Sequence, residues 1–585
     1  MPARFRTGIG VEPSWRGATT SAPYSLVYRN PPRRFFNCEA MMRGSRRSPK
    51  GRMSRRLRES SLAPVAMNRY ARCAHCNPSL AEATPVVTKT YQNLIGGEWT
   101  PAGSGATFTS VSPANHDDVV GEFAASGPAD VDAAVAAATR AFPAWSAMPA
   151  PKRGEILFRI ARLLAEHKEE LSKLMTREIG KVLPEARGDV QEAIDVAYYM
   201  AGEGRRLFGQ TVPSEMPDKF AMAIRRPIGV VGIITPWNFP VAIPGWKLFP
   251  ALICGNTAVI KPASDTPACL VRFVELLLEG GLPEGVVNVV TGSGAEVGNA
   301  IVDHPDIRVI SFTGHTDTGI EISRRAAETL KRVSLELGGK NPIVIWEDAD
   351  LDLALDSVVW SAFGTSGQRC TAASRLIVHR SIHDDFVHRL QQRVAKLVLG
   401  DGLDETTDVG PVINESAIER IASYAAIGRT EADLVIGGQP AREGALAKGS
   451  FFEPTIFAEV KPDARIAQEE IFGPFTSVIP VETWDEAVRV VNGVKYGLSS
   501  SLFTNDIGLA FRSIRDFDTG LGYVNHGTIG AEAHLPFGGT KATGNGHREV
   551  GQASLDFFSE WKSVYIDYSG KLQRAQIDMT FIDEG

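Results

Sequence analysis

The sequence predicts an α/β protein built around parallel sheets. Between residues 228 and 339, short stretches rich in Val and Ile alternate regularly with helical patterns. The same alternation returns between residues 341 and 525. Repeated β-α-β units with nearly continuous apolar strands are typical of a parallel sheet that helices cover on both faces. Because ligands of such sheets bind at the carboxyl ends of the strands, functional residues are expected in the loops there.

The composition is that of an ordinary globular protein with a large core. The chain has 585 residues, of which 43% are hydrophobic and 22% are charged. No uninterrupted apolar run approaches the ~20 residues that a membrane span requires, so no transmembrane helix is predicted. Six cysteines are too few for a disulfide framework in a chain of this length, and they favour a reducing compartment.

The net charge of −6 is unevenly distributed along the chain. Residues 1–66 contain 14 Lys and Arg against 3 Asp and Glu, whereas the remainder contains 48 against 65. An acidic body is a poor general binder of nucleic acid. We therefore expect no nucleic acid and no membrane as a partner of the main part of the chain.

Residues 1–88 are rich in Arg, Ser and Pro and lack sustained apolar periodicity, so we expect a disordered basic N-terminal extension. Three interpretations remain open: a mitochondrial transit peptide, a basic arm for nucleic acid or membrane, and an upstream extension that the mature protein lacks. We prefer the interpretation as an upstream extension, because Met67 could be the true start of the protein. Cys73 and Cys76 form a lone CxxC without a second pair nearby, so no metal site is predicted.

Ordered structure is expected to begin near Tyr91. Residues 91–100 predict two short strands around Gly96 and Gly97, which is a hairpin signal. Helices are then predicted for residues 128–142 and 184–205, and a helical pattern between them runs through Glu178. That middle pattern depends on apolar residues at helical spacing, namely Leu157, Ile160, Leu164, Leu171 and Leu174.

Five strands are predicted in the first parallel sheet, and glycine or polar residues follow them. These residues are expected to meet at one edge of the sheet, since the strand ends meet there. The expected strands are 228–235, 257–263, 285–292, 307–314 and 332–339. The expected helices are 244–255, 267–281, 292–304 and 315–328. The residues at the strand ends are Trp237 and Asn238, Lys261, Gly292 to Gly294, Gly314 and His315, and Glu336.

The second α/β region combines one clear helix with several strands. The helix, at residues 348–364, leads directly into the segment SAFGTSGQRCTAASR at residues 361–375. Residues 557–569 alternate apolar and polar side chains, and such a strand near a chain end is a candidate for pairing with another subunit. The strands predicted in this region are 342–347, 375–380, 451–457, 475–481, 496–504 and 520–525.

Cys370 lies in a segment that favours a reactive thiol. Gly364 and Gly367 precede it, and glycine lets the backbone approach a ligand closely. Residues 371–374 are small and can open a helix, whose unpaired amides would lower the pKa of the thiol. A buried structural cysteine explains this stretch equally well, because free cysteine is among the most buried residue types.

Two glycine-containing segments can bind the pyrophosphate of a dinucleotide. Gly292 to Gly298 and Gly314 to Gly319 both follow predicted strands and open predicted helices, where backbone amides are free for phosphate. Neither is a GxGxxG, so tight turns are the simpler explanation of each segment alone. No GxxxxGK[ST] occurs in a strand-to-helix turn, which disfavours phosphoryl transfer.

Seven motifs in one order resemble the aldehyde dehydrogenase superfamily. The resemblance extends from about Tyr91 to the C-terminus and is nearest to its semialdehyde-oxidising branches, the α-ketoglutaric and aminoadipic semialdehyde dehydrogenases. The segments NFPVAIPGWK and TIGAEAHLPFGG carry this finer likeness. The seven motifs are PWNFP at residue 236, WK at 246, KPA at 261, FTGHTDTG at 312, ELGGKNP at 336, GQRC at 367 and EEIFGP at 469.

The resemblance implies an aldehyde dehydrogenase-like α/β fold with two Rossmann-related parallel-sheet domains and a small β oligomerisation arm. It implies an NAD(P)-binding domain at residues 89–336, with 208–227 contributing to the arm, and a catalytic domain at residues 337–535. Residues 536–585 would form a C-terminal segment with an oligomerisation strand. A homodimer or homotetramer is expected, in the cytoplasm or, if residues 1–66 are a transit peptide, in the mitochondrial matrix.

The resemblance also assigns catalytic roles. Cys370 would attack the aldehyde to give a thiohemiacetal, and Asn238 would hold the developing oxyanion together with the Cys370 amide. After hydride transfer, Glu336 would activate water to hydrolyse the thioester, which favours a free carboxylic acid as the product. Lys247 would lie near the catalytic centre. A turn role for Asn238 and a capping role for Glu336 are the alternatives.

For the cofactor, the resemblance implies NAD or NADP. Lys261 and Glu470 would hold ribose hydroxyls, while Trp237 and Phe472 would shape the site. Ser264 is neutral where relatives restricted to NAD often have an acid, so it would not repel a 2′-phosphate, and we expect NADP to be accepted beside NAD. The other residues expected to bind the cofactor are Thr235, Pro236, Gly294, Gly298, Gly314, His315, Gly319 and Leu337.

A small-molecule aldehyde is the expected substrate. Arg369 can hold an anionic tail such as the carboxylate of a semialdehyde, although an outward salt bridge in its loop is equally compatible with the sequence. The substrate pocket is expected to include Phe239, Trp246, Thr371 and Phe537 as well. The function predicted is NAD(P)-dependent oxidation of an aldehyde, with a semialdehyde as the expected substrate. A non-catalytic dinucleotide-binding protein on the same fold is the alternative.

Overall fold

The computed structural model describes residues 89–577. The disorder and transit-peptide predictions for residues 1–88, the Cys73–Cys76 pair and the proposed start at Met67 lie outside the described residues. Residues 578–585 lie outside them too. None of the described helices is both long and apolar enough to cross a membrane.

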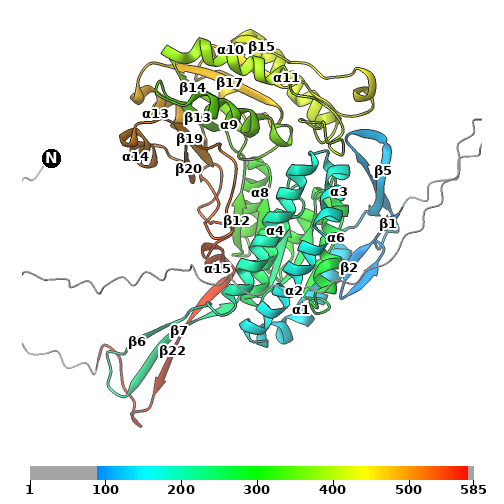
Figure 1. The fold of residues 1–585 in the computed structure, drawn as a ribbon. Coiled ribbons are helices and arrows are strands. Elements are labelled where there is room, and N and C mark those ends of the chain that lie inside the picture. Colours follow the sequence, from blue (N-terminus) through cyan, green and yellow to red (C-terminus); the bar gives the residue numbers. More distant parts are fainter. Residues whose placement is uncertain (1–88, 578–585) are drawn as a thin grey trace, which may run out of the picture. The chain divides into compact units, whose positions relative to one another are not determined.

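The first large sheet confirms the predicted β-α-β pattern of residues 228–339 (Figure 1). Strands β8 to β12 are parallel, and β2 and β3 form the predicted antiparallel hairpin at Gly96 and Gly97. The strand order is β12 (Arg332–Glu336), β11 (Ile307–Thr313), β8 (Val230–Ile234), β9 (Thr257–Lys261), β10 (Val287–Val289), β2 (Asn93–Ile95) and β3 (Glu98–Thr100).

Helices cover both faces of this sheet, because successive strand residues point to opposite sides. On β8, Val231 and Ile233 belong to the core that contains α5 and α6, whereas Val230 and Ile234 belong to the core that contains α1 and α8. Burial of each such side chain stabilises the fold by about 1.5–3 kcal/mol. The helices are α1 (Pro128–Ala147), α5 (Ala242–Cys254), α6 (Pro267–Glu279) and α8 (Thr316–Ala327).

Two helix predictions in this region need correction. The pattern that runs through Glu178 is two helices, α2 (Ala150–Glu166) and α3 (Lys168–Ile179), because His167 leaves helical geometry at φ −97° and ψ 12°. Both helices still pack on α4 (Leu183–Glu203), so the apolar spacing survives the break. Residues 292–304 form a widened turn at Gly294–Gly298 and a short helix, α7 (Asn299–Asp303), instead of one helix.

The second large sheet contains most of the strands predicted between residues 341 and 525, although the strand predicted at 451–457 begins only at Thr455 and β15 was not predicted. Its strands are parallel except β15, which is antiparallel to β16. The order is β15 (Asp433–Ile436), β16 (Thr455–Ala458), β17 (Phe475–Val481), β14 (Ala373–His379), β13 (Asn341–Ile345), β19 (Ser499–Phe503) and β20 (Leu521–Val524). Its helices are α9 (Leu351–Phe363), α10 (His383–Val394), α11 (Glu415–Glu431), α12 (Arg465–Gln468), α13 (Trp484–Asn492) and α14 (Ile507–Asp516).

Two predictions around this sheet are wrong. Residues 371–374 do not open a helix, because Ala373 begins β14 and pairs with Asn341 of β13. Residues 496–504 are not one strand: Tyr496–Gly497 is β18, which pairs with β21 (Thr540–Lys541), and only Ser499–Phe503 joins the large sheet as β19. In both cases pairing with a strand distant in sequence decides the local structure.

A narrow antiparallel ribbon extends away from both large sheets (Figure 1). It consists of β6 (Gln210–Pro213), β7 (Lys219–Pro227) and β22 (Ser559–Asp567), with β7 in the middle. The alternating strand predicted at residues 557–569 is therefore present, although Phe557 ends a short helix, α15 (Ala553–Phe557). A further small sheet contains β1 (Thr90–Tyr91), β5 (Asn115–Ala124) and β4 (Thr107–Ser112).

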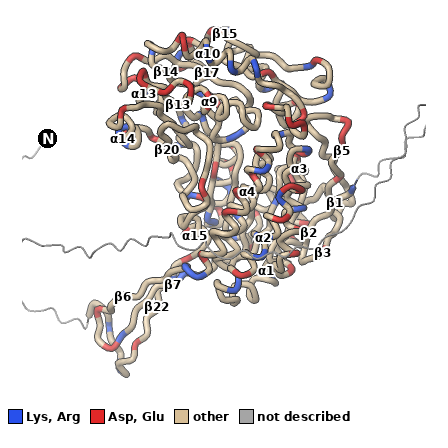
Figure 2. The backbone as a smooth tube through the Cα atoms, viewed as in Figure 1, with Lys and Arg blue, Asp and Glu red and all other residues tan. Residues whose placement is uncertain are grey.

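Charged residues are spread through the described part of the chain. Figure 2 shows Lys and Arg interspersed with Asp and Glu along the backbone of both sheet regions. Many of them form exposed ion pairs, such as Arg187 with Glu169 at 2.8 Å and Arg380 with Glu459 at 2.6 Å. Exposed pairs of this kind contribute little stability, about 0–1 kcal/mol each.

Candidate functional site

Two cavities meet at Cys370. The larger, of about 270 Å³, is lined by residues from the strand ends of the first sheet and from the loop after α12. The smaller, of about 50 Å³, is lined mostly by apolar side chains together with Cys370, and we call it the narrow passage. The residues that line both cavities are Ile243, Thr313, Leu337 and Cys370. The thiol is therefore accessible from two directions.

Cys370 is partly exposed to these cavities but otherwise enclosed by protein. The pKa of its thiol is raised to about 12, first by burial and then by the nearby carboxyls of Glu470 and Glu336, while the Thr371 amide lowers it. The predicted lowering of the pKa by a helix start is wrong, because Cys370 precedes strand β14 and not a helix. A thiol with this pKa needs a base before it can act as a nucleophile.

The loop before Cys370 is held in an unusual backbone conformation. Thr365, Ser366 and Gly367 have successive positive φ values of 51°, 54° and 68°. The left-handed region costs a non-glycine residue about 1–2 kcal/mol, so the surroundings must stabilise the loop. The Ser366 hydroxyl donates to the Gly410 carbonyl at 2.7 Å, and the Gln368 side chain accepts from the Ile413 amide at 2.9 Å.

Asn238 lies beside this loop. It follows β8, is buried, and donates its side-chain amide to the Gln368 carbonyl at 3.0 Å. Asn238 also lines the larger cavity together with Cys370. The structure thus places an amide donor and the thiol at the same cavity.

Glu336 ends β12 and lines the narrow passage with Cys370. Its side chain is buried, and neither carboxyl oxygen has a hydrogen-bond partner among the described residues. Burial raises its pKa well above the ordinary value, the Glu549 carboxyl raises it further, and the Lys247 ammonium lowers it. A buried, unpaired carboxyl next to a thiol is a candidate general base.

Lys247 is connected to the site by Glu549, a residue that the sequence did not indicate. Its ammonium forms a buried ion pair with Glu549 and donates to the Ser311 hydroxyl at 3.0 Å. Glu549 lines the narrow passage and is held by backbone hydrogen bonds with Phe537. Because Glu549 lies 302 residues from Lys247 in the chain, no local pattern indicates this contact.

The larger cavity contains many of the predicted cofactor residues. The rings of Trp237 and Phe472 pack edge to face at 5.6 Å on one side of it. Glu470 accepts from the Gly339 amide at 2.8 Å, and burial raises its pKa to about 7. Pro236, Gly314, His315 and Leu337 also line this cavity, as does Arg420, which the sequence did not indicate.

The remaining predicted cofactor residues do not line this cavity. Lys261, at the end of β9, donates to the Pro262 carbonyl at 2.7 Å, and burial lowers its pKa to about 8. It lies beside Gly298, where an added Cβ would be 3.9 Å from the Lys261 side chain. The Ser264 hydroxyl donates to the Gly292 carbonyl at 3.1 Å.

Three further predicted cofactor residues lie in the nearby backbone segments. The Thr235 amide donates to the Lys261 carbonyl at 3.1 Å. Gly294 begins the widened turn after β10, and an added Cβ there would meet open space. Gly319 lies in α8 and packs on Leu337, whose side chain would be 2.5 Å from an added Cβ.

The narrow passage has the predicted aromatic walls. The rings of Trp246 and Phe537 lie 4.8 Å apart, and Thr371 and Phe239 line the passage with them. Phe239 lies under two cations, with the Lys181 ammonium 4.0 Å and the Arg369 guanidinium 5.5 Å from its ring centre. Such contacts fix the ring orientation next to Asn238.

Arg369 lines the passage but already has a protein partner. Its guanidinium is 3.3 Å from the Glu185 carboxylate, and both side chains are 11% exposed. It also donates to the Thr365 hydroxyl at 3.0 Å. The salt bridge considered from the sequence is therefore present, but it points inward to α4 and not outward, because Glu185 and the loop face each other.

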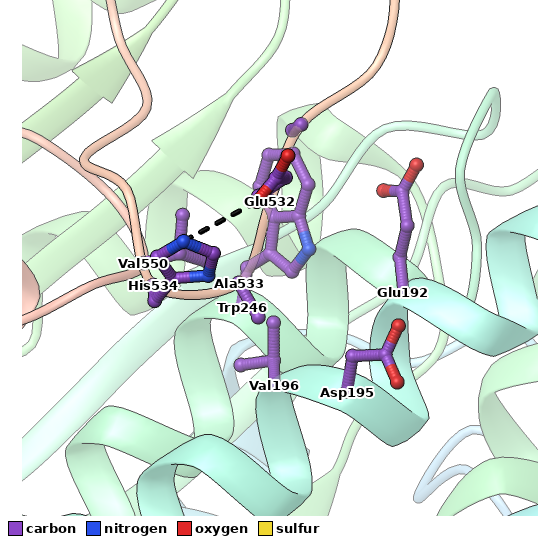
Figure 3. A pocket seen from close by; sticks show the side chains of 9 residues that line it. Glu192, Asp195, Val196, Trp246, Glu532, Ala533, His534 and Val550 are labelled. Carbon is purple, nitrogen blue, oxygen red and sulfur yellow. Dashed lines mark ion pairs between the residues drawn. The ribbon is translucent and has the colours of Figure 1, made fainter. Parts of the chain in front are cut away.

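An outer pocket of about 230 Å³ adjoins the passage and shares Glu192, Trp246 and Ala531 with it. Figure 3 shows Glu192 and Asp195 on α4 on one side, with Glu532 and His534 on the opposite loop and Trp246 between them. Glu532 and His534 form an ion pair at 3.2 Å. Burial raises the pKa of Glu192 to about 8. The sequence did not indicate the acidic side chains of this pocket.

The fold and the site define a class of protein, and comparisons with known proteins agree. The model of the aldehyde dehydrogenase family matches residues 99–564. The chain therefore belongs to the aldehyde dehydrogenase family, as the resemblance of its motifs predicted. It is an enzyme that oxidises aldehydes to carboxylic acids with NAD⁺ or NADP⁺.

Individual relatives within this family are similar to the chain over nearly their whole length. The α-ketoglutaric semialdehyde dehydrogenase of Bacillus subtilis is 41% identical over 478 residues, which cover 82% of this chain and 98% of that protein. The NADP⁺ succinate-semialdehyde dehydrogenase of Escherichia coli is 39% identical and covers 81% and 97%. The crystal structure of Staphylococcus aureus betaine aldehyde dehydrogenase with NAD⁺ matches with a TM-score of 0.80 at 36% identity, covering 82% and 95%. The predicted fold class is confirmed.

Proposed function

We propose that the substrate is a semialdehyde and that Cys370, Asn238 and Glu336 carry its oxidation. The observation that carries this proposal is the meeting of a thiol, an amide and an unpaired carboxyl where two cavities join. Relatives named as α-ketoglutaric semialdehyde, 2,5-dioxopentanoate and succinate-semialdehyde dehydrogenases support a semialdehyde. The aldehyde would enter from the outer pocket through the narrow passage.

Cys370 is proposed to attack the aldehyde carbon. Because the pKa of its thiol is about 12, the proton must pass to a base, and Glu336 lines the same passage. The S–C bond then forms as the carbonyl oxygen gains negative charge. The Asn238 side-chain amide and the Cys370 backbone amide are proposed to donate to that oxygen.

Glu336 is proposed to complete the reaction. Bound NAD⁺ or NADP⁺ supplies the hydride acceptor, after which the acyl group remains on Cys370 as a thioester. Glu336, after it has released the thiol proton to solvent, takes a proton from water, and the resulting hydroxide attacks the acyl carbon. The C–S bond breaks to release the carboxylic acid, and the Cys370 thiolate regains a proton from Glu336. Its raised pKa suits this role, because a stronger base removes a proton from water more readily.

The residues of the larger cavity fit a dinucleotide. Trp237 and Phe472 form an aromatic wall, and the cavity leads to Cys370. Lys261 and Glu470 are proposed to hold ribose hydroxyls, while the open space at Gly294 suits the approach of a phosphate. Ser264 carries no negative charge, so we propose that the enzyme accepts both NAD⁺ and NADP⁺.

Purified protein with NAD⁺ or NADP⁺ and matched aldehydes tests the substrate proposal. Semialdehydes that end in a carboxylate should give a higher kcat/KM than aldehydes of equal length that end in a methyl group, measured by absorbance at 340 nm. Cys370→Ala should abolish turnover of both sets. A higher kcat/KM for the methyl-ended set would contradict the proposal.

The division of the chain and its assembly are also proposals. We propose a cofactor domain at residues 89–336, a catalytic domain at 337–535 and a C-terminal segment at 536–585, because the two large sheets fall within the first two ranges. The ribbon of β6, β7 and β22 is proposed to join subunits into a homodimer or homotetramer. Its exposed Val212, Trp561 and Tyr565 support this role. We propose a cytoplasmic location, with the mitochondrial matrix as the alternative.

A further inference from the structure

We propose that Glu185 is a positioning residue for the proposed nucleophile. Its carboxylate, on α4, holds the loop at residues 364–369 in the backbone conformation that presents Cys370 between the two cavities. The proposal adds a residue outside the reacting centre and depends on the proposed role of Cys370. Glu185 touches the loop and not the thiol, so its effect is indirect.

The carboxylate makes several contacts with the loop at once. One oxygen accepts from the Thr365 amide at 2.7 Å and from the Thr365 hydroxyl at 3.0 Å. The other oxygen is 3.3 Å from the Arg369 guanidinium. Arg369 in turn donates to the Thr365 hydroxyl at 3.0 Å. Glu185, Thr365 and Arg369 therefore form a closed set of charge-assisted contacts directly before Cys370.

The loop needs such a support because its conformation is unfavourable for its residues. Thr365 and Ser366 both occupy the left-handed region, and a β-branched residue such as Thr is rare there. The buried Thr365 amide has its acceptor on Glu185, so loss of the carboxylate leaves a buried donor unpaired. Gly364 fits closely against the same carboxylate, since an added Cβ would lie 2.7 Å from it.

The helix that carries Glu185 also supports the opposite side of the site. One turn further along α4, Asp189 accepts from the Ala242 amide at 2.7 Å and pairs with buried Lys181 at 3.0 Å. Ala242 begins α5, directly after the segment that contains Asn238. Residues four apart lie on the same face of a helix. One face of α4 therefore contacts the loop before Cys370 through Glu185 and the start of α5 through Asp189. The segment that contains Asn238, the proposed oxyanion donor, directly precedes α5.

Glu185→Ala, Glu185→Gln and the control Glu169→Gln test this role. Glu169 lies on α3 and pairs with Arg187 of α4 at 2.8 Å on the surface, so its variant breaks an ion pair to α4 without touching the loop. For each protein, the alkylation rate of Cys370 by iodoacetamide is followed against pH by peptide mass spectrometry. Steady-state kcat, KM and the NAD⁺ dissociation constant are measured on the same samples.

Glu185→Ala should lower kcat by roughly 10- to 100-fold, since small displacements of a reacting group cost about that much. It should also change the pH profile of Cys370 alkylation, while NAD⁺ affinity stays within about two-fold of wild type. Glu169→Gln should leave all three unchanged. Glu185→Gln keeps the side-chain shape and one hydrogen-bond acceptor, so its kcat and alkylation profile should lie between those of wild type and Glu185→Ala. If Glu185→Ala does not fold, Glu185→Gln provides the test.

Thr365→Gly provides a second readout, because glycine adopts this backbone conformation without strain. In the Thr365→Gly background, Glu185→Ala should reduce kcat by a smaller factor than in wild type. Equal factors in both backgrounds would overturn the proposal, as would an alkylation profile in Glu185→Ala identical to that of wild type. Alkylation needs no aldehyde, so failure of the semialdehyde proposal would leave this readout unaffected.

Discussion

At the scale of single residues, the chemistry of the site depends on how burial shifts the pKa values of Cys370 and of the carboxyls near it. Burial raises the pKa of the Cys370 thiol and of the Glu336 carboxyl together. Because its pKa is raised, the ionised carboxyl of Glu336 is a stronger base than an ordinary carboxylate and accepts the thiol proton more readily. The amide of Asn238 and the ion pair of Lys247 with Glu549 lie at the same two cavities as Cys370.

Asn238→Ala should lower kcat by about 10²–10³, because one of two proposed oxyanion donors is lost. KM for the aldehyde should change much less, since the oxyanion forms only during the reaction. Steady-state kinetics with both cofactors measure this effect. Asn414→Ala, which removes a helix cap in α11, is a control for a general loss of stability. A kcat of wild-type size in Asn238→Ala would contradict the role.

Glu549→Gln should shift the pH dependence of kcat to lower pH. Glu549 raises the pKa of Glu336 and neutralises Lys247, so its loss lowers the pKa of Glu336 twice over. The basic form of Glu336 would then persist at lower pH, and the acid limb of the profile would move in that direction. Removal of one partner from a buried ion pair should also cost about 3–5 kcal/mol of stability. Profiles of kcat from acid to alkaline pH, together with urea unfolding, measure both effects.

At the scale of secondary structure elements, runs of Val and Ile correctly predicted the parallel strands β8 to β12 and several strands of the second sheet, whereas β15 was not predicted. The sequence did not reveal the break between α2 and α3, because one non-helical residue at His167 leaves the apolar spacing intact. It also misjudged residues 371–374 and 496–504, where pairing partners distant in sequence decide the structure. Local patterns carry no information about such partners.

The same limit applies to the site. The resemblance of motifs indicated Cys370, Asn238, Glu336 and Lys247, which the structure brings to one region. It did not indicate Glu549 or Glu185, whose contacts join segments 302 and 180 residues apart. The side chains at the outer pocket were missed for the same reason, since α4 and the loop at residues 531–534 meet only in the folded chain.

Helix α6 supplies a prediction about stability and pH. Glu178 accepts from the amides of Ala268 and Cys269 at the start of α6, at 2.7 and 2.9 Å, and burial raises its pKa from 4.5 to about 7. The folded state thus holds this proton more tightly than the unfolded state. Its contribution to stability is full below about pH 4.5 and is lost as pH rises through about 7.

Glu178→Gln should therefore weaken the fall in Tm between about pH 5 and pH 8, because the amide cannot ionise. The variant Glu166→Gln, at an exposed carboxylate near the end of α2, should leave the slope unchanged. Thermal unfolding across this range measures both variants. A wild-type slope in Glu178→Gln would show that this carboxyl does not titrate as its burial requires.

At the scale of the whole molecule, the ribbon of β6, β7 and β22 presents apolar side chains to solvent. Tyr565 is 69% exposed and Ile566 49% exposed. Exposed apolar patches of this kind mark interaction surfaces. The proposed assembly therefore explains why a ribbon separate from the two large sheets carries exposed apolar side chains.

Tyr565→Asp combined with Ile566→Asp should shift the protein to a smaller oligomer, because charge is costly in an apolar interface. Light scattering after size-exclusion chromatography measures the mass. Leu330→Asp changes a 93% exposed apolar residue outside the ribbon and should leave the mass unchanged. A wild-type protein that is monomeric at micromolar concentration would contradict the assembly proposal.

The central claim is that an acyl group passes through the sulfur of Cys370 and leaves by hydrolysis that Glu336 assists. Glu336→Gln, mixed with NAD⁺ and a semialdehyde, tests it most directly. We expect about one equivalent of NADH per active site and then no further turnover, with the first turnover slower than in wild type because Cys370 has lost its proposed base. We also expect a mass increase equal to the acyl group on the Cys370 peptide. Turnover that persists in Cys370→Ala, or an acyl adduct on another residue, would contradict the claim.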